Sequence, residues 1–264
     1  MQTHYRNGGI QIEIKKIAKS LIEGIGDILY PHRCPVCDDV LPVGSDCTLC
    51  IKCKGKVEKV TDPYCLKCGK KICDDSRQYC TDCQKKEHIY TQGRAAFVYD
   101  RHMKKSIAAF KYGGRREYGK YYSGEIVKKY GEWIDSIGAQ CLIPVPIHRE
   151  RYRKRGYNQA KVIADEIGNM TKLPVIDDYI ERGKNTEALK NLNEAQRKLC
   201  LKDAFFISEA SKLLYHDLRC VILVDDIYTT GSTIDECARV LKKTGVKKIY
   251  FLCICIGKDD QGGE

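Results

Sequence analysis

The chain has 264 residues, enough for one α/β domain and a smaller module. Its composition, 43% hydrophobic and 31% charged, is that of a soluble globular protein, and no run is long and apolar enough to span a membrane. A formal net charge of +11 favours phosphorylated or polyanionic partners, although an ordinary basic surface explains that total equally well.

The first 30 residues are expected to form an amphipathic helix. One stripe with helical spacing carries Ile10, Ile14, Ile17, Leu21 and Ile25. Charged residues interrupt the segment, which is therefore unlike a signal peptide or a membrane anchor, and we expect a cytoplasmic protein. A helix of this kind packs on its own domain more often than on a partner.

Ten of the sixteen cysteines lie between Cys34 and Cys83. Most belong to Cys-x-x-Cys pairs, in which one tight turn presents two sulfurs to Zn²⁺. In a reducing compartment such a cluster indicates metal sooner than disulfides. The simplest assignment is two zinc sites in a double ribbon at residues 31–90. The ligands would be Cys34, Cys37, Cys47 and Cys50 in the first site and Cys65, Cys68, Cys80 and Cys83 in the second.

Two alternatives to this assignment stay open. The first and third pairs could share one metal, so we expect one or two structural Zn²⁺ ions. Cys53 and Cys73 fall outside the pattern and could replace a ligand or simply be small buried residues. Because so small a core depends on metal for its folding energy, we expect the ribbons to collapse under chelation.

Apolar strands alternate with helical segments from residue 91 to residue 258. Strands are expected at 94–100, 141–146, 221–224 and 248–256, and helices at 102–113, 116–134, 158–170 and 233–245. Nearly continuous apolar strands that alternate with helices predict an α/β fold with a parallel sheet covered on both faces. Ligands of such sheets bind beyond the carboxyl ends of the strands.

The segment VILVDDIYTTGST, residues 221–233, places Asp225 and Asp226 directly after a predicted buried strand. Adjacent carboxylates can accept hydrogen bonds from a vicinal diol or hold a divalent cation near one. The turn that follows offers hydroxyls and backbone amides at the start of a helix, where a phosphate binds. Diol and phosphate together describe a ribose 5-phosphate. A capping box of Thr233 and Glu236 would explain part of the turn but not the aspartates.

These motifs resemble a known family. VILVDDIYTTGST is similar to the phosphoribosyl pyrophosphate (PRPP) motif of type I phosphoribosyltransferases. IPVPIHRERYRKRGYNQA, residues 143–160, resembles the signature of the ComF family of competence proteins, which also carry an N-terminal double zinc ribbon. The resemblance runs from Cys34 to about Gly257. After the helix expected at 1–30, it implies a double ribbon (31–90) and a type I phosphoribosyltransferase-like domain (91–258).

The resemblance implies roles for individual residues. Asp225 and Asp226 would bind the ribose hydroxyls and serve in catalysis. The 5-phosphate would be bound by Thr229, Thr230, Gly231, Ser232 and Thr233. The diphosphate, together with Mg²⁺, would be bound by Lys111 and, from the loop after Pro146, by Arg149, Arg151 and Arg155. Arginine matches phosphate oxygens with paired hydrogen bonds, whereas the alternative for this charge run is a solvated surface.

Residues 182–205 resemble the mobile loop, or lid, of the family. Arg182, Thr186 and Arg197 match its pattern, whereas Leu189 and Cys200 stand where Gln and Asn are usual. The resemblance therefore implies binding of PRPP or a related ribose 5-phosphate ligand more firmly than it implies turnover.

Membership of this family would imply a role in the uptake or processing of single-stranded DNA during natural transformation, beside a helicase-like ATPase. Lysines of the ribbons, with Tyr64 and Tyr79 among them, could form a surface for a strand, although these tyrosines could equally pack the ribbons. The alternative is an Mg²⁺-dependent phosphoribosyltransferase of purine or nucleotide metabolism without a DNA role. An interaction scaffold is supported only by the ribbons.

Overall fold

The computed structural model describes residues 31–42, 48–183 and 200–259. It divides into two compact units, Met1–Lys56 and Val57–Glu264. The helix predicted at residues 1–30 lies outside the described residues. In the part of the chain that is described, every helix is too short or too polar to cross a membrane.

The described part of the first unit consists mainly of turns. It contains the 3-10 helix η1 (Ile51–Cys53) and an antiparallel bridge between Arg33 and Val40. Its buried apolar side chains, within the ranges described, are Cys34, Val36, Leu41 and Cys53. So few buried groups cannot offset the conformational entropy of the chain, and this unit depends on a cross-link such as a metal ion.

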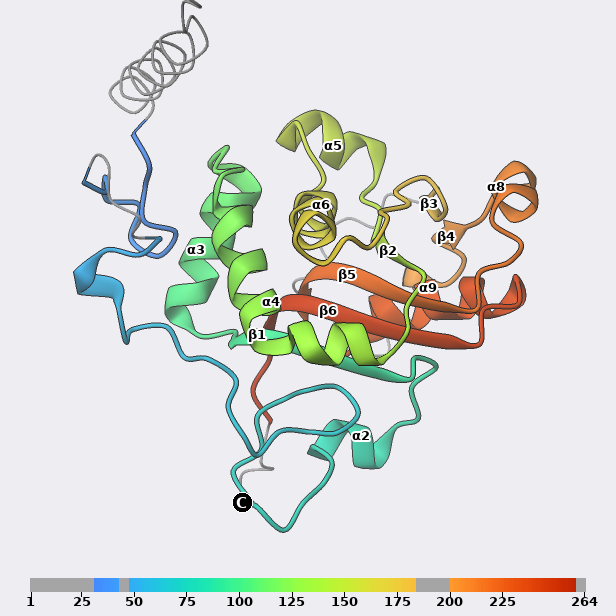
Figure 1. The fold of residues 1–264 in the computed structure, drawn as a ribbon, viewed down its shortest axis with the longest axis horizontal. Helices are drawn as coiled ribbons and strands as arrows, with labels where there is room; N and C mark the ends of the chain where they lie inside the picture. Colours follow the sequence, from blue (N-terminus) through green and yellow to red (C-terminus); the bar gives the residue numbers. More distant parts are fainter. Residues whose placement is uncertain (1–30, 43–47, 184–199, 260–264) are drawn as a thin grey trace, which may run out of the picture. The chain divides into compact units, whose positions relative to one another are not determined.

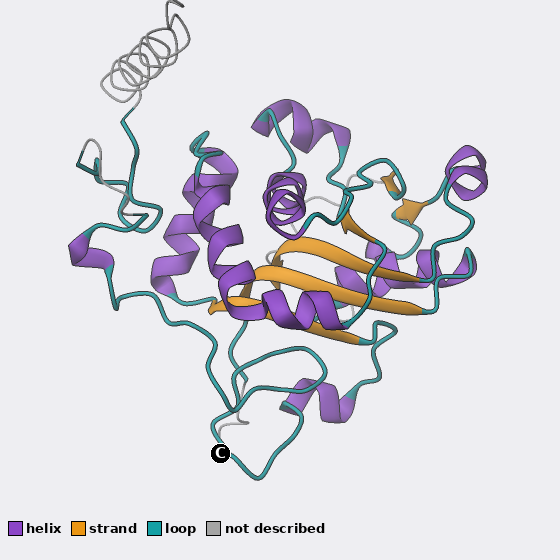
Figure 2. Cartoon of the chain, in the orientation of Figure 1, coloured by secondary structure: helices purple, strands orange, loops and turns teal. Residues whose placement is uncertain are grey.

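The second unit is built on a four-stranded parallel sheet (Figure 2). In the order β1-β6-β5-β2, its strands are β1 (Gln92–Val98), β6 (Lys248–Ile256), β5 (Cys220–Tyr228) and β2 (Cys141–Pro144). The two central strands, β5 and β6, are apolar and buried over most of their length. This confirms the predicted parallel sheet, because strands covered on both faces read as continuous apolar runs.

Helices cover both faces of this sheet (Figure 1). On one face, α4 (Tyr118–Ser136) packs against α6 (Gln159–Thr171) and against the strands, with α3 (Arg101–Tyr112) beside α4 through the Phe110 and Tyr122 rings. On the other face, α9 (Ser232–Lys243) buries Ile234 and Cys237 in one cluster with strand residues such as Leu223.

Short elements complete the second unit. They are α2 (Thr81–Lys85), α5 (Arg149–Arg155), α8 (Glu209–Leu214) and an antiparallel pair, β3 (Glu181–Arg182) with β4 (Phe205–Phe206). The β3–β4 pair flanks residues 184–199, which include most of the predicted lid and lie outside the described residues.

Several elements differ from the prediction. β1 begins and ends two residues earlier than expected, and β2 ends at Pro144 and not at residue 146. β5 does not end at Val224 but continues through the aspartates to Tyr228, because β6 pairs with it along that whole length. The predicted loop after Pro146 contains the helix α5, in which arginine, lysine and glutamate are good helix formers. His148 caps its start by accepting a hydrogen bond from the Glu150 amide, and Gly156, at a φ of 79°, ends it.

Glycines on this sheet and its helices allow a stability test. A Cβ at Gly93 in β1 would overlap the buried ring of Phe251, whereas a Cβ at Gly124 in α4 would meet open space. We expect Gly93→Ala to lower the free energy of unfolding by about 1–3 kcal/mol through overpacking. The control, Gly124→Ala, should raise it by about 0.5–1 kcal/mol. Urea unfolding measures both, and a neutral Gly93→Ala would contradict the packing described.

Candidate functional site: the carboxyl end of strand β5

The candidate site lies at the point where β2 ends and its neighbour β5 continues. β2 ends at Pro144, which pairs with Val224, while β5 continues beside β6 to Tyr228. Asp225 and Asp226 therefore lie on the extension of β5 beyond the end of β2, at the carboxyl edge of the sheet. This is the location at which parallel sheets bind their ligands.

Asp225 lies in surroundings that disfavour its charge. Burial and the neighbouring Asp226 raise the pKa of Asp225 to about 7, against the lowering effects of Lys111 and Arg182. Its Oδ1 accepts a hydrogen bond of 2.8 Å from the Asp226 amide. A carboxyl group with a pKa near neutral can hold or release a proton at the site.

Asp226 is paired with a lysine. Lys111 Nζ, from the last turn of α3, lies 2.8 Å from Oδ1 and 2.7 Å from Oδ2 of Asp226. Both side chains are mostly buried. The predicted contact of Lys111 with a diphosphate stays a prediction. In this structure its ammonium binds the acidic pair instead, at the same edge of the sheet.

The arginines of α5 divide between the site and the solvent. Arg155 donates hydrogen bonds to the Tyr112 hydroxyl (3.1 Å) and to Gln159 Oε1 (2.9 Å). Burial and the nearby charge of Arg155 lower the pKa of Arg151, which also interacts with Asp226. Arg149 is exposed. Of the three predicted diphosphate ligands, Arg151 and Arg155 thus lie near the site, and Arg149 fits the solvated alternative better.

Arg182 is the predicted lid residue that the structure describes. Its guanidinium lies 5.1 Å from the centre of the Phe205 ring, so the β3–β4 pair holds it in place. Burial and the charge of Arg151 lower its pKa to about 10. Thr186 and Arg197 lie outside the described residues, and Cys200 is exposed.

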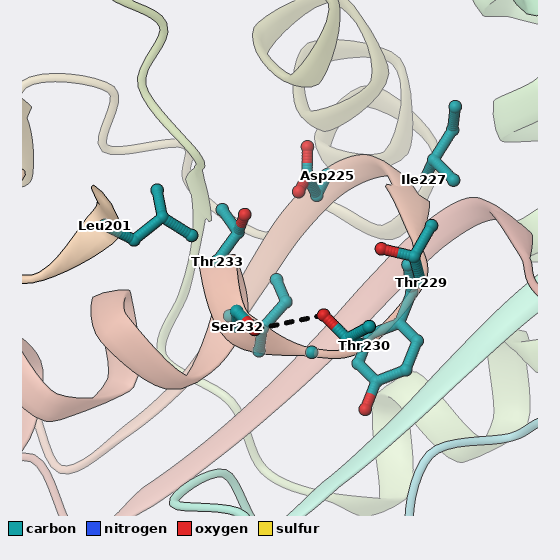
Figure 3. Close-up of a pocket in the computed structure, with 10 residues that line it drawn as sticks. Leu201, Asp225, Ile227, Thr229, Thr230, Ser232 and Thr233 are labelled. Carbon is teal, nitrogen blue, oxygen red and sulfur yellow. Dashed lines mark hydrogen bonds between the residues drawn. The ribbon is translucent and has the colours of Figure 1, made fainter. Parts of the chain in front are cut away.

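The turn after β5 forms a pocket with the start of α9 (Figure 3). The pocket is open to solvent and measures about 390 Å³ including its open mouth. It is lined by Leu201, Asp225, Ile227, Tyr228, Thr229, Thr230, Gly231, Ser232, Thr233 and Ile234. The five predicted phosphate ligands and Asp225 therefore share one hollow.

The amides at the start of α9 face this turn. The helix begins at Ser232 with Gly231 as its N-cap at a φ of 78°, and no side chain of the described residues caps it. The capping-box prediction is wrong, because Glu236 accepts hydrogen bonds from the Asp203 amide and from Arg239 instead. Uncapped N–H groups at a helix start form an anion site, with the Thr230 and Ser232 hydroxyls 3.0 Å apart beside them.

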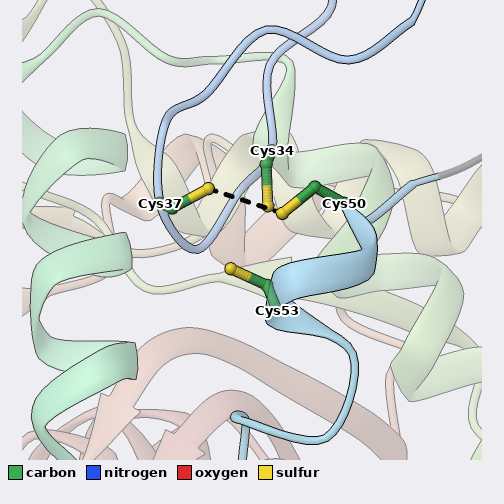
Figure 4. Close-up of side chains that lie close together, drawn as sticks. All are labelled: Cys34, Cys37, Cys50 and Cys53. Carbon is green, nitrogen blue, oxygen red and sulfur yellow. Dashed lines mark hydrogen bonds between the residues drawn. The ribbon is translucent and has the colours of Figure 1, made fainter.

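The first cysteine group consists of Cys34, Cys37, Cys50 and Cys53, whose side chains point toward one another (Figure 4). The sulfurs all lie within 4.8 Å, and those of Cys37 and Cys50 are 3.6 Å apart. A tetrahedral zinc site with bonds of about 2.3 Å requires separations of about 3.8 Å, so this group fits Zn²⁺. Cys53 completes it, whereas the predicted ligand Cys47 lies outside the described residues.

The second cysteine group consists of the predicted ligands Cys65, Cys68, Cys80 and Cys83. The sulfurs of Cys68 and Cys80 lie 3.5 Å apart, which also suits Zn²⁺. Each group is drawn from pairs that are neighbours in the sequence, so ligation is not interleaved. Cys73 is exposed and belongs to neither group.

Comparison with known protein families gives one match to the cysteine-rich part of the chain and one to the part that contains the pocket. Residues 25–84 match the family model of the double zinc ribbon domain, and residues 152–263 match that of the phosphoribosyl transferase domain. The chain is 34% identical over 110 residues to Competence protein F of Haemophilus influenzae, an alignment that covers 42% of this chain and 47% of that protein.

Two further relatives carry related names. Identity is 28% over 168 residues with Competence protein ComFC of Streptococcus pneumoniae, which covers 62% of this chain and 68% of that protein. It is 28% over 114 residues with DNA utilization protein YhgH of Escherichia coli, at 43% and 48% coverage. The alignments thus span about half to two thirds of these relatives. The two matched domains and these relatives agree with the resemblance of the sequence motifs to the ComF family.

Sequence reasoning named Cys53 only as an alternative ligand and missed the contact of Tyr112 with Arg155. Cys53 follows Cys50 with the same spacing that separates Cys47 from Cys50, so spacing alone could not choose between them. Tyr112 directly follows Lys111 at the end of α3, and its contact with Arg155 depends on how α3 and α5 pack, which no local pattern reports.

The cysteine groups predict the metal content. The wild-type protein should bind two Zn²⁺ per chain, and Cys53→Ser should leave one, because a three-thiolate site loses much of its affinity. Cys73→Ser is the matched control and should retain two. Elemental analysis after dialysis measures the ratio. Two zinc ions in Cys53→Ser would contradict the first group.

The raised pKa of Asp225 predicts a pH effect on stability. The folded state holds this proton more tightly than the unfolded state, so the stabilisation is complete below about pH 4 and is lost as the pH rises through about 7. Asp225→Asn removes the effect. The free energy of unfolding of wild type minus that of the variant should therefore fall as the pH rises from about 4 to about 7, and should be constant above about pH 8.

Urea unfolding in zinc-containing buffer measures this difference at each pH. Asp135→Asn, on the exposed side of α4, is the control for the loss of an aspartate elsewhere in the same unit. A difference for Asp225→Asn that stays constant from about pH 4 to about pH 8 would contradict the raised pKa of Asp225.

Proposed function

We propose that this protein binds a ribose 5-phosphate group, carried by PRPP or a related ligand, where β5 passes into α9. The observation that supports this most is the shared pocket, which is lined by the half-buried carboxyl group of Asp225 and by the uncapped start of α9. The two ends match the two ends of the ligand, since carboxylates accept hydrogen bonds from sugar hydroxyls and amides donate to a phosphate.

The phosphate end of the ligand would occupy the turn. The amides of Ser232 and Thr233 and the hydroxyls of Thr230 and Ser232 donate to its oxygens, and the dipole of α9 adds to the attraction. Gly231 is needed at the N-cap because its φ is positive and because a Cβ there would press against the Tyr228 hydroxyl.

The sugar end would bind the acidic pair. Asp225 and Asp226 accept from the ribose hydroxyls, and Lys111 must release Asp226 at least in part when this happens. In PRPP the diphosphate, held with Mg²⁺, would lie toward the cations Arg151, Arg155 and Arg182. If PRPP is turned over, these cations stabilise the departing pyrophosphate while the carboxylates stabilise the electron-poor ribose.

The wider role we propose is in handling single-stranded DNA, beside a helicase-like ATPase. The relatives named as competence and DNA utilization proteins support it. So does the exposed side of α5, where Arg149, Arg153 and Lys154 accompany the half-exposed Tyr152, a combination of cations and a ring that suits a DNA backbone and its bases.

Calorimetric titration with ribose 5-phosphate, and with PRPP plus Mg²⁺, tests the pocket. Gly231→Ala should weaken binding at least about tenfold, because the Cβ displaces the turn. Gly245→Ala is the matched control: Gly245 also has a positive φ, at 96°, but follows the far end of α9. It should cost similar stability and leave affinity unchanged. Equal affinities for the wild-type protein and Gly231→Ala would contradict the proposed binding site.

A further inference from the structure

The second cysteine group is buried within the phosphoribosyltransferase core. Cys65, Cys68 and Cys80 have no exposed surface and cluster with the face of the sheet that α9 covers. The backbone of the turn between the first two cysteines pairs with the start of β1, where the Gly93 amide donates to the Lys67 carbonyl at 2.8 Å. This metal group is therefore part of the sheet's packing and not an appendage to it.

An aromatic contact links this group to the phosphate-binding turn. Lys67 Nζ donates a hydrogen bond of 2.5 Å to the Tyr90 carbonyl, and the Tyr90 hydroxyl shares one of 2.6 Å with the Tyr228 hydroxyl. Tyr228 is the last residue of β5, directly before the turn. Both rings pack on Phe251, with centres 4.9 Å away for Tyr90 and 4.7 Å away for Tyr228. Tyr90 and Phe251 thus hold Tyr228, the residue directly before the turn.

The segment after Cys83 holds the other side of the turn. Lys86 Nζ donates to the Thr230 carbonyl at 3.3 Å. Asp235, in the first turn of α9, accepts 2.8 Å from His88 Nδ1 and 3.0 Å from the Ile89 amide. A few residues directly after the last cysteine therefore contact both the turn and the helix whose amides would bind the phosphate.

The turn has little room to adapt. A Cβ on Gly231 would meet the Tyr228 hydroxyl and the His88 ring together. The imidazole of His88 is fully buried and stacks on Tyr90 at 4.8 Å. A shift of residues 86–90 by a fraction of an ångström would therefore move Gly231 and the amides that follow it.

We propose that metal binding by the second cysteine group and sugar-phosphate binding by the turn are thermodynamically coupled, with Lys86, His88 and Tyr90 as positioning residues. Zn²⁺ on four thiolates fixes Cys80 and Cys83, and so the start of the segment that holds the turn. The ligand half of this inference rests on the proposed function. Coupling is reciprocal: the factor by which Zn²⁺ tightens ligand binding equals the factor by which the ligand tightens Zn²⁺ binding.

Linked titrations measure this coupling on the whole chain. Ribose 5-phosphate affinity is determined at full zinc loading and after partial removal by a chelator. Zinc affinity is then determined by chelator competition, with and without saturating ribose 5-phosphate. The two factors should agree and lie within about 5- to 150-fold. Zinc in the first group, which belongs to the other compact unit, is the internal control and should be held equally tightly with and without ligand.

Tyr90→Phe tests the link without removing metal. It deletes the hydroxyl that meets Tyr228 and should weaken ribose 5-phosphate binding several-fold at full zinc loading. Tyr130→Phe is the matched control, because it deletes another buried hydroxyl of the same unit, bonded to the Ala95 carbonyl at 3.0 Å. It should leave the affinity unchanged. Equal affinities for the two variants would overturn the role of Tyr90.

A readout that needs no ligand separates this inference from the proposed function. Backbone amide NMR signals of Gly231 and Ser232 should shift when zinc leaves the second group and in Tyr90→Phe, but not in Tyr130→Phe. The inference would be overturned if neither the affinity for ribose 5-phosphate nor the NMR signals of Gly231 and Ser232 changed when zinc leaves the second group. The proposed function would remain intact in that case. If the wild-type protein with full zinc loading binds no ribose 5-phosphate, the proposed function fails. The NMR signals of Gly231 and Ser232 alone then support or overturn the claim that the second cysteine group positions the turn.

Discussion

The candidate site depends on the unequal lengths of two neighbouring strands. β6 pairs with β5 as far as Tyr228, whereas β2 stops at Pro144. The pairing with β6 keeps Asp225 and Asp226 in rigid extended backbone, and the absence of β2 beside them opens the edge to a ligand. A carboxyl group buried in this way is costly unless cations lie near it. Lys111 and Arg182 supply that charge.

The two metal groups have different settings although one family model covers both. The group that contains Cys34 provides two of the few buried residues, Cys34 and Cys53, that its own small unit has in the described ranges. The group that contains Cys68 is packed among Tyr90, Tyr228 and Phe251, beneath the turn between β5 and α9. In this protein a zinc ribbon is thus structurally continuous with a transferase-type pocket, which is why metal and ligand are expected to influence one another.

The sequence predicted what local patterns encode. β6 has the predicted bounds, because nine residues starting at Lys248 are almost uniformly apolar, and Asp225 lines one pocket with the glycine-containing turn. Three features depend on tertiary contacts and were not predictable. Pairing with β6 lengthens β5, Glu236 accepts a hydrogen bond from the Asp203 amide, and Lys111 is held by Asp226. For the first metal group, Cys47 and Cys53 lie equally far from Cys50 in the sequence, so spacing alone did not decide which of them is the fourth ligand.

A crystal structure with bound ribose 5-phosphate tests the central claim most directly, because it reports where each end of the ligand lies. The account predicts the phosphate within hydrogen-bond distance of the amides that follow Gly231. It also predicts the sugar hydroxyls on Asp225 and Asp226, with Lys111 shifted from its present position. A phosphate bound elsewhere, or hydroxyls that leave the acidic pair untouched, would contradict it.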